Sequence, residues 1–195
     1  MTKQIDFYFD FISPYTYLAI KKIRSLQKNN KINLNYCPIL LGGLHNLKGI
    51  TPPAFIKSKL DFMIYDCNIV AKKFNLKFTF NSKFPINSIK LMRGFLIIDN
   101  DIKDKYIDIM FDAYWSNNLD VGDENILGNL ISECGINKES FFKKINEQKI
   151  KNQLKDNTKK AHEKDIFGAP TFIVNNKIFW GQDRLEYALE EFNAN

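Results

Sequence analysis

The chain has 195 residues, of which 45% are hydrophobic, 14% aromatic and 26% charged, with a formal net charge of +6. This composition is typical of a globular protein and excludes a disordered chain, a collagen-like repeat and a disulfide-stabilised scaffold. Because no stretch approaches eighteen uninterrupted apolar residues and the N-terminus lacks a signal-peptide pattern, we expect no membrane partner and a cytoplasmic location.

The first elements in the chain predict a strand, a helix and a second strand. Apolar and polar residues alternate over 5–11, which is the period of a strand. Ser13 followed by Pro14 predicts a helix start, because the serine oxygen can accept free amide hydrogens and proline has none to lose. An amphipathic helix then runs to about residues 29–30. A second alternating run over 32–38 predicts a strand parallel to the first.

The C-terminal end predicts two strands and a helix. Residues 171–174 form a β-rich run, and the asparagines at 175–176 suit a two-residue hairpin turn that leads to a strand at 177–180. Asp183 and Glu186 have the spacing of a capping box for a final helix. A strand-helix-strand unit and a strand-strand-helix unit that share one sheet are typical of a thioredoxin-like α/β fold.

The segment between these two units is too long for a loop, and its apolar spacing is helical almost throughout. Expected helices lie at 54–74, 87–99, 101–116, 123–134, 138–148 and 147–165. We therefore predict a thioredoxin-like domain formed by 1–44 and 165–195, with an all-helical insertion domain at 45–164. The insertion should contain no strand ladder.

Cysteine, histidine and lysine positions exclude several kinds of site. Cys37, Cys67, Cys134, His45 and His162 are far apart, so neither a disulfide framework nor a metal site is predicted. Most basic residues are scattered lysines, and no basic block is interleaved with aromatic residues. This pattern indicates a solvated surface and no nucleic-acid partner.

The predicted reactive position of this fold lies where the first helix begins. The sequence there is Ser13-Pro14-Tyr15-Thr16, and without a cysteine this site cannot perform dithiol-disulfide exchange. The fold also places a cis proline before the third strand, and Pro170 would turn the Ala169 backbone toward the helix start. A site that binds the thiolate of another molecule, with Ser13 as hydrogen-bond donor, is consistent with both features. The alternatives are that Ser13 only caps the helix and that Pro170 is an ordinary trans proline.

Seven segments follow one another in the order found in a known family. They are FYFDFISPYTYLA at 7–19, PILLGGL at 38–44, PPA at 52–54 with Lys59 after it, FPINS at 84–88, AYW at 113–115, FGAPTF at 167–172 and FWGQDRLEY at 179–187. On these segments the chain resembles the 2-hydroxychromene-2-carboxylate isomerase family, whose relatives are the kappa-class glutathione transferases. The resemblance implies a thioredoxin-like domain with a helical insertion, glutathione as cofactor and a homodimer.

The resemblance also implies roles for individual residues at the thiol. Ser13 would donate a hydrogen bond to the glutathione sulfur and act as the catalytic residue. The Ala169 backbone before Pro170 would pair with the cysteinyl part of glutathione, and Lys59 would meet a carboxylate. Taken alone, Lys59 is one of many surface lysines.

Further roles implied by the resemblance concern the two ends of the bound molecules. Gln182 and Asp183 would hold the γ-glutamyl group, and Asn87 and Phe84 would lie at the hydrophobic substrate pocket. Each has a structural alternative: helix capping for Asp183 and Asn87, and core packing for Phe84. Ile50 departs from the family, which typically has an asparagine here that helps to hold glutathione.

The implied activity is isomerisation of a small aromatic α-keto acid or chromene carboxylate through reversible addition of a Ser13-stabilised glutathione thiolate. Two other functions stay open on the sequence. One is a kappa-type glutathione transferase or peroxidase, which would consume glutathione. The other is a non-catalytic thioredoxin-like binding module, which would have no open cleft at Ser13.

Overall fold

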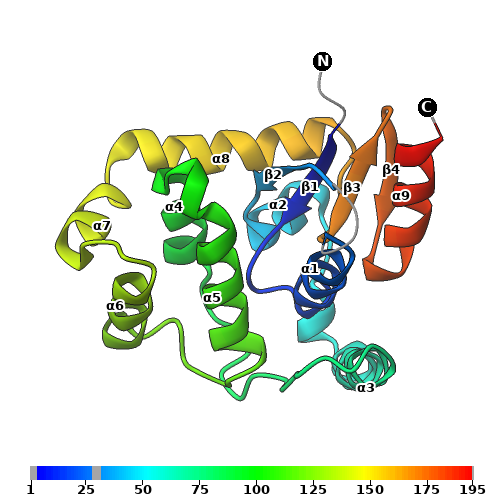
Figure 1. Ribbon diagram of the computed structural model, residues 1–195, viewed down its shortest axis with the longest axis horizontal. Coiled ribbons are helices and arrows are strands. Elements are labelled where there is room, and N and C mark those ends of the chain that lie inside the picture. The colour runs from blue at the N-terminus through cyan, green and yellow to red at the C-terminus, as the bar shows by residue number, and fades with distance from the viewer. Residues whose placement is uncertain (1–3, 28–31, 195) are drawn as a thin grey trace.

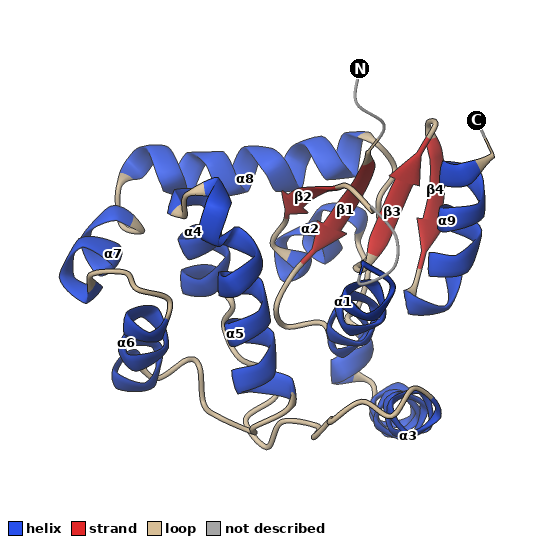
Figure 2. Ribbon diagram, viewed as in Figure 1, coloured by secondary structure: helices blue, strands red, loops and turns tan. Residues whose placement is uncertain are grey.

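The computed structural model describes residues 4–27 and 32–194, and these contain a four-stranded sheet (Figures 1 and 2). In sheet order the strands are β2 (Leu34–Pro38), β1 (Ile5–Phe9), β3 (Thr171–Val174) and β4 (Lys177–Trp180). β1 is parallel to β2 and antiparallel to β3, which is antiparallel to β4. α1 (Pro14–Gln27) connects the parallel pair, and α9 (Leu185–Asn193) follows β4. The predicted thioredoxin-like arrangement is confirmed.

The chain between β2 and β3 is helical, as predicted. Its helices are α2 (Leu41–Lys48), α3 (Lys57–Lys73), α4 (Ile89–Ile97), α5 (Lys103–Trp115), α6 (Glu124–Glu133), α7 (Lys138–Lys144) and α8 (Gln148–Glu163). Two 3₁₀ turns, η1 (Pro53–Phe55) and η2 (Asn100–Ile102), precede α3 and α5. Every strand that the structure describes lies outside residues 45–160.

Alternate residues of β1 supply two hydrophobic cores on opposite faces of the sheet, because successive strand side chains point to opposite sides. Phe7 stacks on Phe172 with ring centroids 5.2 Å apart, and Phe9 meets Phe95 of α4 edge-on at 5.0 Å. Tyr8 belongs to the other core, together with residues of α2 and α8 such as Leu44. The sheet is therefore covered by helices on both faces.

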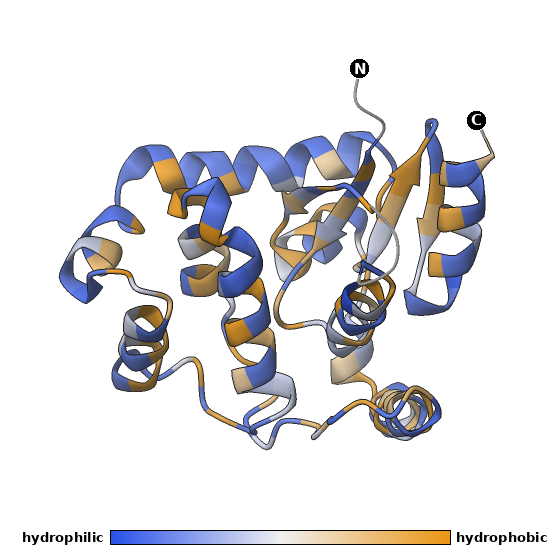
Figure 3. Cartoon of the chain, in the orientation of Figure 1, coloured by the Kyte–Doolittle hydropathy of each residue, from blue (hydrophilic) through white to orange (hydrophobic). Residues whose placement is uncertain are grey.

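Helix α8 shows how this burial follows from sequence. Ile150, Leu154, Thr158 and Ala161 are its buried residues and recur every three or four positions. Figure 3 shows that the rest of α8 is mostly hydrophilic. In the described residues no helix is long and apolar enough to cross a bilayer.

Helix α2 was not expected, because Gly42 and Gly43 lie within it and glycine is a poor helix former. Its N-terminus is stabilised by a residue distant in sequence: Asp10 Oδ2 accepts a hydrogen bond from the backbone N–H of Leu41 at 2.8 Å. Helices α2 and α8 pack directly against each other. α2 crosses the expected boundary between residues 44 and 45, and the division into two domains stays a prediction.

Three other expectations need correction or fall outside the description. The first strand ends at Phe9 rather than at residue 11, because the chain turns at Asp10, whose carbonyl accepts from the N–H of Ser13 at 3.1 Å. The predicted capping box is wrong: η3 (Gln182–Arg184) precedes α9, whose first turn has no side-chain cap. The expected helix end near residues 29–30 lies outside the described residues.

Candidate functional site

Ser13 lies between β1 and α1 and is 4% exposed. Its Oγ accepts a hydrogen bond from the backbone N–H of Thr16 at 3.2 Å, which is the predicted cap geometry. The same hydroxyl donates to the backbone carbonyl of Ala169 at 2.9 Å. Ser13 therefore caps α1 and also contacts the segment before β3, which is 156 residues away in the chain.

The Ala169-Pro170 peptide bond is cis, as predicted. Ala169 is 8% exposed and faces the start of α1, and the Pro170 carbonyl accepts a hydrogen bond from Gly181 at 2.9 Å. The Phe84-Pro85 bond is also cis, which was not predicted. The backbone before β3 is thus held on one side by Ser13 and on the other by the residue after β4.

Asp10 connects the Ser13 loop to α2. The carboxylate is fully buried, and besides Leu41 it accepts from the backbone N–H of Ile12 at 3.2 Å. Burial raises the pKa of Asp10 to about 6, although hydrogen bonds from backbone amides and from Ser88 oppose this shift. Asp10 therefore fixes the loop that positions Ser13.

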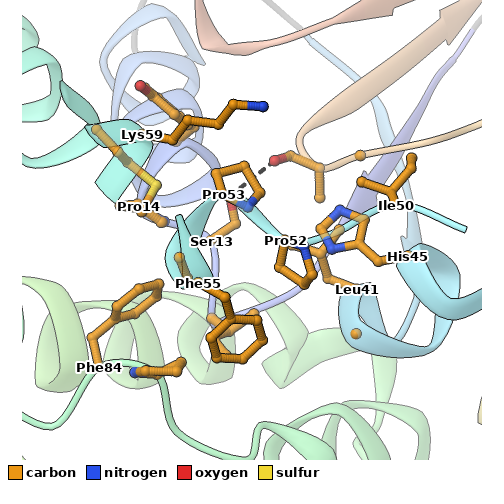
Figure 4. Close-up of a pocket in the computed structure, with 18 of the residues that line it drawn as sticks. Ser13, Pro14, Leu41, His45, Ile50, Pro52, Pro53, Phe55, Lys59 and Phe84 are labelled. Carbon is orange, nitrogen blue, oxygen red and sulfur yellow. Dashed lines mark hydrogen bonds between the residues drawn. The ribbon is translucent and has the colours of Figure 1, made fainter. Parts of the chain in front are cut away.

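A pocket of about 570 Å³ opens beside Ser13 (Figure 4), a volume that suits a small organic ligand. Its wall comes from the start of α1, from α2, from η1 and α3, and from the segment before β3. Most lining residues are apolar or aromatic, among them Leu41, Ile50, Pro52, Phe55, Phe84 and Trp180. Such a wall favours a ligand with an apolar or aromatic part.

A few polar side chains also line the pocket. Besides Ser13 they include Tyr15, His45 and Lys59. The pKa of Tyr15 is raised, first by burial and then by neighbouring groups that include the Asp66 carboxylate. The pKa of His45 is lowered by burial, and Lys59 is exposed at the pocket. No group of three or more metal-ligating side chains that could hold an ion occurs within residues 4–27 and 32–194.

Comparison with known proteins assigns the family. A family model described as a DSBA-like thioredoxin domain matches residues 4–193. The chain belongs to this DSBA-like thioredoxin family. It is 28% identical to the 2-hydroxychromene-2-carboxylate isomerase of Sphingobium xenophagum, with 96% of both chains covered. It is 26% identical to glutathione S-transferase kappa 1 of Caenorhabditis elegans, over 93% of this chain and 87% of the relative.

A solved structure of 2-hydroxychromene-2-carboxylate isomerase has the same fold. Its TM-score with this DSBA-like chain is 0.90, at 24% identity, and the match covers 97% of this chain and 94% of the other. The resemblance stated from the seven sequence segments is thereby confirmed. In the present chain the sequence at the start of α1 is Ser13-Pro14-Tyr15-Thr16, which contains no cysteine.

Several residues singled out from sequence meet at this pocket of the DSBA-like fold. Ser13, Lys59, Ala169 and Phe84 all line it, although they come from four separate segments. Figure 4 shows Ser13 between Lys59 on one side and His45 on the other. Ile50, at the position where the resemblance expects asparagine, also lines the pocket.

Three other residues are placed differently. Gln182 is buried, and its Oε1 accepts a hydrogen bond from the Lys22 ammonium. Asp183 is exposed and pairs with Arg184 at 3.1 Å. Asn87 is exposed and accepts from the backbone N–H of Ile89 at 3.0 Å. Neither Gln182, Asp183 nor Asn87 is among the described residues that line the pocket.

Sequence reasoning did not assign Tyr15, His45 or Trp180 to the site. The sequence contained a signal for Tyr15, because this residue belongs to the first turn of α1 directly after the Ser13-Pro14 pair. His45 and Trp180 carried no local signal. They reach the pocket because α2 packs with Ala169 and because Trp180 of β4 lies next to Gly168.

Proposed function

We propose that the protein is a glutathione-dependent isomerase that acts on an aromatic α-keto acid or chromene carboxylate. The observation that carries the proposal is the buried Ser13 hydroxyl, at the start of α1, against Ala169 and in the wall of a largely apolar pocket. Relatives named as isomerase and kappa transferase align along nearly the whole chain. The proposed location is the cytoplasm, because the reaction requires reduced glutathione.

The residues at the pocket fit a tripeptide thiol. The Ser13 O–H can donate to a thiolate, and the N-terminus of the 14-residue helix α1 favours negative charge. Ala169 offers backbone to an extended peptide, and Lys59 offers an ammonium to a carboxylate. Bound glutathione would supply a thiolate that adds reversibly to an unsaturated carbon of the substrate, which permits rotation about the former double bond.

The Ser13 hydroxyl would act by redirecting its proton. In the structure this proton goes to the Ala169 carbonyl, while the Thr16 N–H donates to the oxygen. Turning the O–H toward the ligand sulfur breaks one neutral hydrogen bond and forms a stronger one to an anion. The Thr16 contact holds the oxygen in place during this change.

The proposed γ-glutamyl site lies beside the pocket rather than in its lining. The Asp183 carboxylate is one of the groups that raise the pKa of Tyr15, a residue of the pocket wall, and this supports a γ-glutamyl site at Asp183. In the proposal Asp183 exchanges its exposed contact with Arg184 for the ligand ammonium, and Gln182 supports this turn. Lys22 already holds the Gln182 side chain.

Phe84 is the proposed aromatic wall for the substrate, since it lines the pocket and its ring lies 5.0 Å from that of Phe80. We assign no substrate contact to Asn87, whose side chain stabilises the start of α4. Ile50 adds apolar surface where an asparagine would add a hydrogen bond, so the backbone and Lys59 must provide more of the binding of glutathione.

Substitution of Ser13 by alanine tests the proposal. We expect the pKa of the bound glutathione thiol to rise and the rate to fall about tenfold to a hundredfold, equivalent to about 1.5–3 kcal/mol, because a hydrogen bond to a charged partner is lost. Thiolate absorbance titrated against pH measures the first effect, and turnover of an aromatic α-keto acid measures the second. Ser116→Ala is the matched control, since Ser116 is also buried but lies at the end of α5.

An equal thiol pKa in wild type and Ser13→Ala, with a lowered melting temperature of the variant, would make Ser13 a structural cap and favour the binding-module function. A cap alone is worth about 1 kcal/mol. Steady consumption of glutathione during turnover would instead indicate a kappa-type transferase, the function named for the relative from Caenorhabditis elegans.

A homodimer is also part of the proposal. Exposed apolar side chains gather on η1 and α3, where Phe55, Phe62, Tyr65 and Ile69 are between 45% and 70% exposed. Phe62, Tyr65 and Ile69 are spaced for one face of the helix. Apolar surface of this kind favours an interface with a protein partner, and we take that partner to be a second copy of the chain.

A further inference from the structure

His45 is a buried polar side chain in the pocket wall. It lies on α2 and is 8% exposed. In Figure 4 its imidazole lies beside Ile50 and Pro52, apart from the Lys59 side chain. Within the described residues, the imidazole has neither a hydrogen-bond partner nor an ion-pair partner. Its ring nitrogens are not among the described buried polar atoms that lack a partner, and His45 lines the pocket, so the imidazole is open to a hydrogen bond with a ligand there.

The charged groups around α2 leave His45 without a counter-ion. On the packed elements they are held by other partners: Lys48 by Asp165 at 3.2 Å, Lys164 by the Tyr8 hydroxyl at 3.2 Å, and Asp10 by the N–H of Leu41. Lys59 is on α3 and exposed, and His162 is on α8. Burial alone lowers the pKa of His45.

Two other polar groups of the pocket already have contacts or an assigned role. The Ser13 hydroxyl is assigned to the thiol, and Tyr15 interacts with Asp66. The rest of the wall near His45 is apolar, with Leu41, Ile50 and Pro52. An anionic group entering this side of the pocket would therefore meet one strong donor, the imidazole of His45.

We propose that His45 binds the carboxylate of the aromatic keto acid, with a charge-assisted hydrogen bond from a protonated imidazole. The inference rests on the proposed function and specifies how its substrate is recognised. A carboxylate and an imidazolium each lose hydration in an apolar wall, and pairing offsets this cost for both. The carboxylate would lie on the His45 side of Ser13, and the reacting carbon at Ser13.

This arrangement couples substrate binding to uptake of a proton. His45 is neutral in the free protein at pH values above its lowered pKa, and the bound carboxylate raises that pKa. The complex therefore binds one more proton than the free protein, and affinity for the acid falls as pH rises through this window.

Binding of 2-oxo-4-phenylbutanoate tests the inference, because this keto acid has no carbon–carbon double bond conjugated to its ketone and so cannot undergo the proposed conjugate addition of a thiol. Its methyl ester is the uncharged control. By titration calorimetry with and without glutathione, we expect the dissociation constant of the acid to rise by up to about tenfold from pH 6.5 to 7.5, the limit for one proton. The ester should show no such change. Heats of binding in buffers of different ionisation enthalpy should report uptake of about one proton by the acid alone.

His45→Phe should abolish the pH dependence and weaken the acid at pH 6.5 by about tenfold, while binding of the ester is kept. His45→Gln retains a donor without a charge, so it should bind the acid with intermediate affinity and no pH dependence. It also serves as the second variant if His45→Phe folds poorly. His162→Gln is the matched control, since it removes the other histidine of the chain and should behave as wild type.

The inference is overturned if acid binding by wild type does not depend on pH, or if the dependence survives in His45→Phe and His45→Gln. It is equally overturned if these variants weaken glutathione and leave the acid unchanged, because His45 would then bind a glutathione carboxylate. If the acid binds with the expected pH dependence but glutathione does not bind, the His45 site is supported and the proposed function is contradicted. If the protein catalyses glutathione-dependent isomerisation but substitution of His45 leaves acid binding unchanged, the proposed function is supported and the His45 site is contradicted.

Discussion

At the residue scale, Asp10 is a buried carboxylate whose pKa of about 6 exceeds the ordinary value of 3.8. The Asp10 carboxyl therefore binds its proton at a higher pH in the folded state than in the unfolded chain. As pH falls from 7 toward 4, this residue favours folding increasingly. The shift corresponds to about 3 kcal/mol. The contribution is present below pH 4 and is lost as pH rises through 6.

Asp10→Asn should remove this pH dependence. We expect the free energy of unfolding of wild type, relative to that of the variant, to increase by up to about 3 kcal/mol as pH falls from 7 to 4. Urea unfolding at several pH values measures it, with Asp156→Asn, at an exposed position on α8, as the control. A difference that stays constant over this range would contradict a raised pKa.

At the element scale, the packing of α4 depends on Gly94. A methyl group at this position would overlap the Tyr106 hydroxyl of α5 and, at 2.6 Å, the Phe141 ring of α7. Tyr106 cannot easily move, because it is fully buried and its hydroxyl donates to the Leu91 carbonyl at 2.9 Å. Three helices of the insertion therefore meet at one glycine.

Gly94→Ala should destabilise the protein by about 1–3 kcal/mol, because overpacking outweighs the better helix propensity of alanine. Gly42→Ala is the matched control: it is also a helical glycine, and no atom lies within 4 Å of the added methyl group. That variant should be neutral or up to about 1 kcal/mol more stable. The denaturant concentrations at the unfolding midpoints of the two variants measure the difference. Equal midpoints would contradict the prediction, because α4 would then move enough to accommodate the added methyl group.

At the scale of the whole molecule, the apolar face of α3 carries the proposed dimer. We expect sedimentation to give twice the mass of the chain, and Tyr65→Glu with Ile69→Glu to give a monomer. The thermal stability of the fold within each chain should change little, because both side chains are exposed. Lys155→Glu on α8 is the control for added negative charge. A monomeric wild type would contradict the dimer.

The sequence by itself determined those features that depend on neighbouring residues. A strand at β1, although shorter than predicted, the β-rich run that forms β3, the Ser13-Pro14 helix start and the asparagine turn at 175–176 all occur, with positive φ at both asparagines. Each depends on side-chain periodicity or on turn conformation, which act over a few residues. One contact between distant segments, the approach of the Ala169 backbone to the start of α1, was also predicted, because the thioredoxin-like topology and the proline before β3 imply it.

Only the tertiary structure decided the features that join distant segments. The strand expected to reach residue 11 ends early and the helix at α2 forms because Asp10 hydrogen-bonds to both regions. His45 became a pocket residue only when α2 packed beside the segment before β3. Local propensity disfavours α2, but burial of Leu44 and capping across 31 residues of sequence outweigh it. Such contacts leave no mark in a short window of sequence.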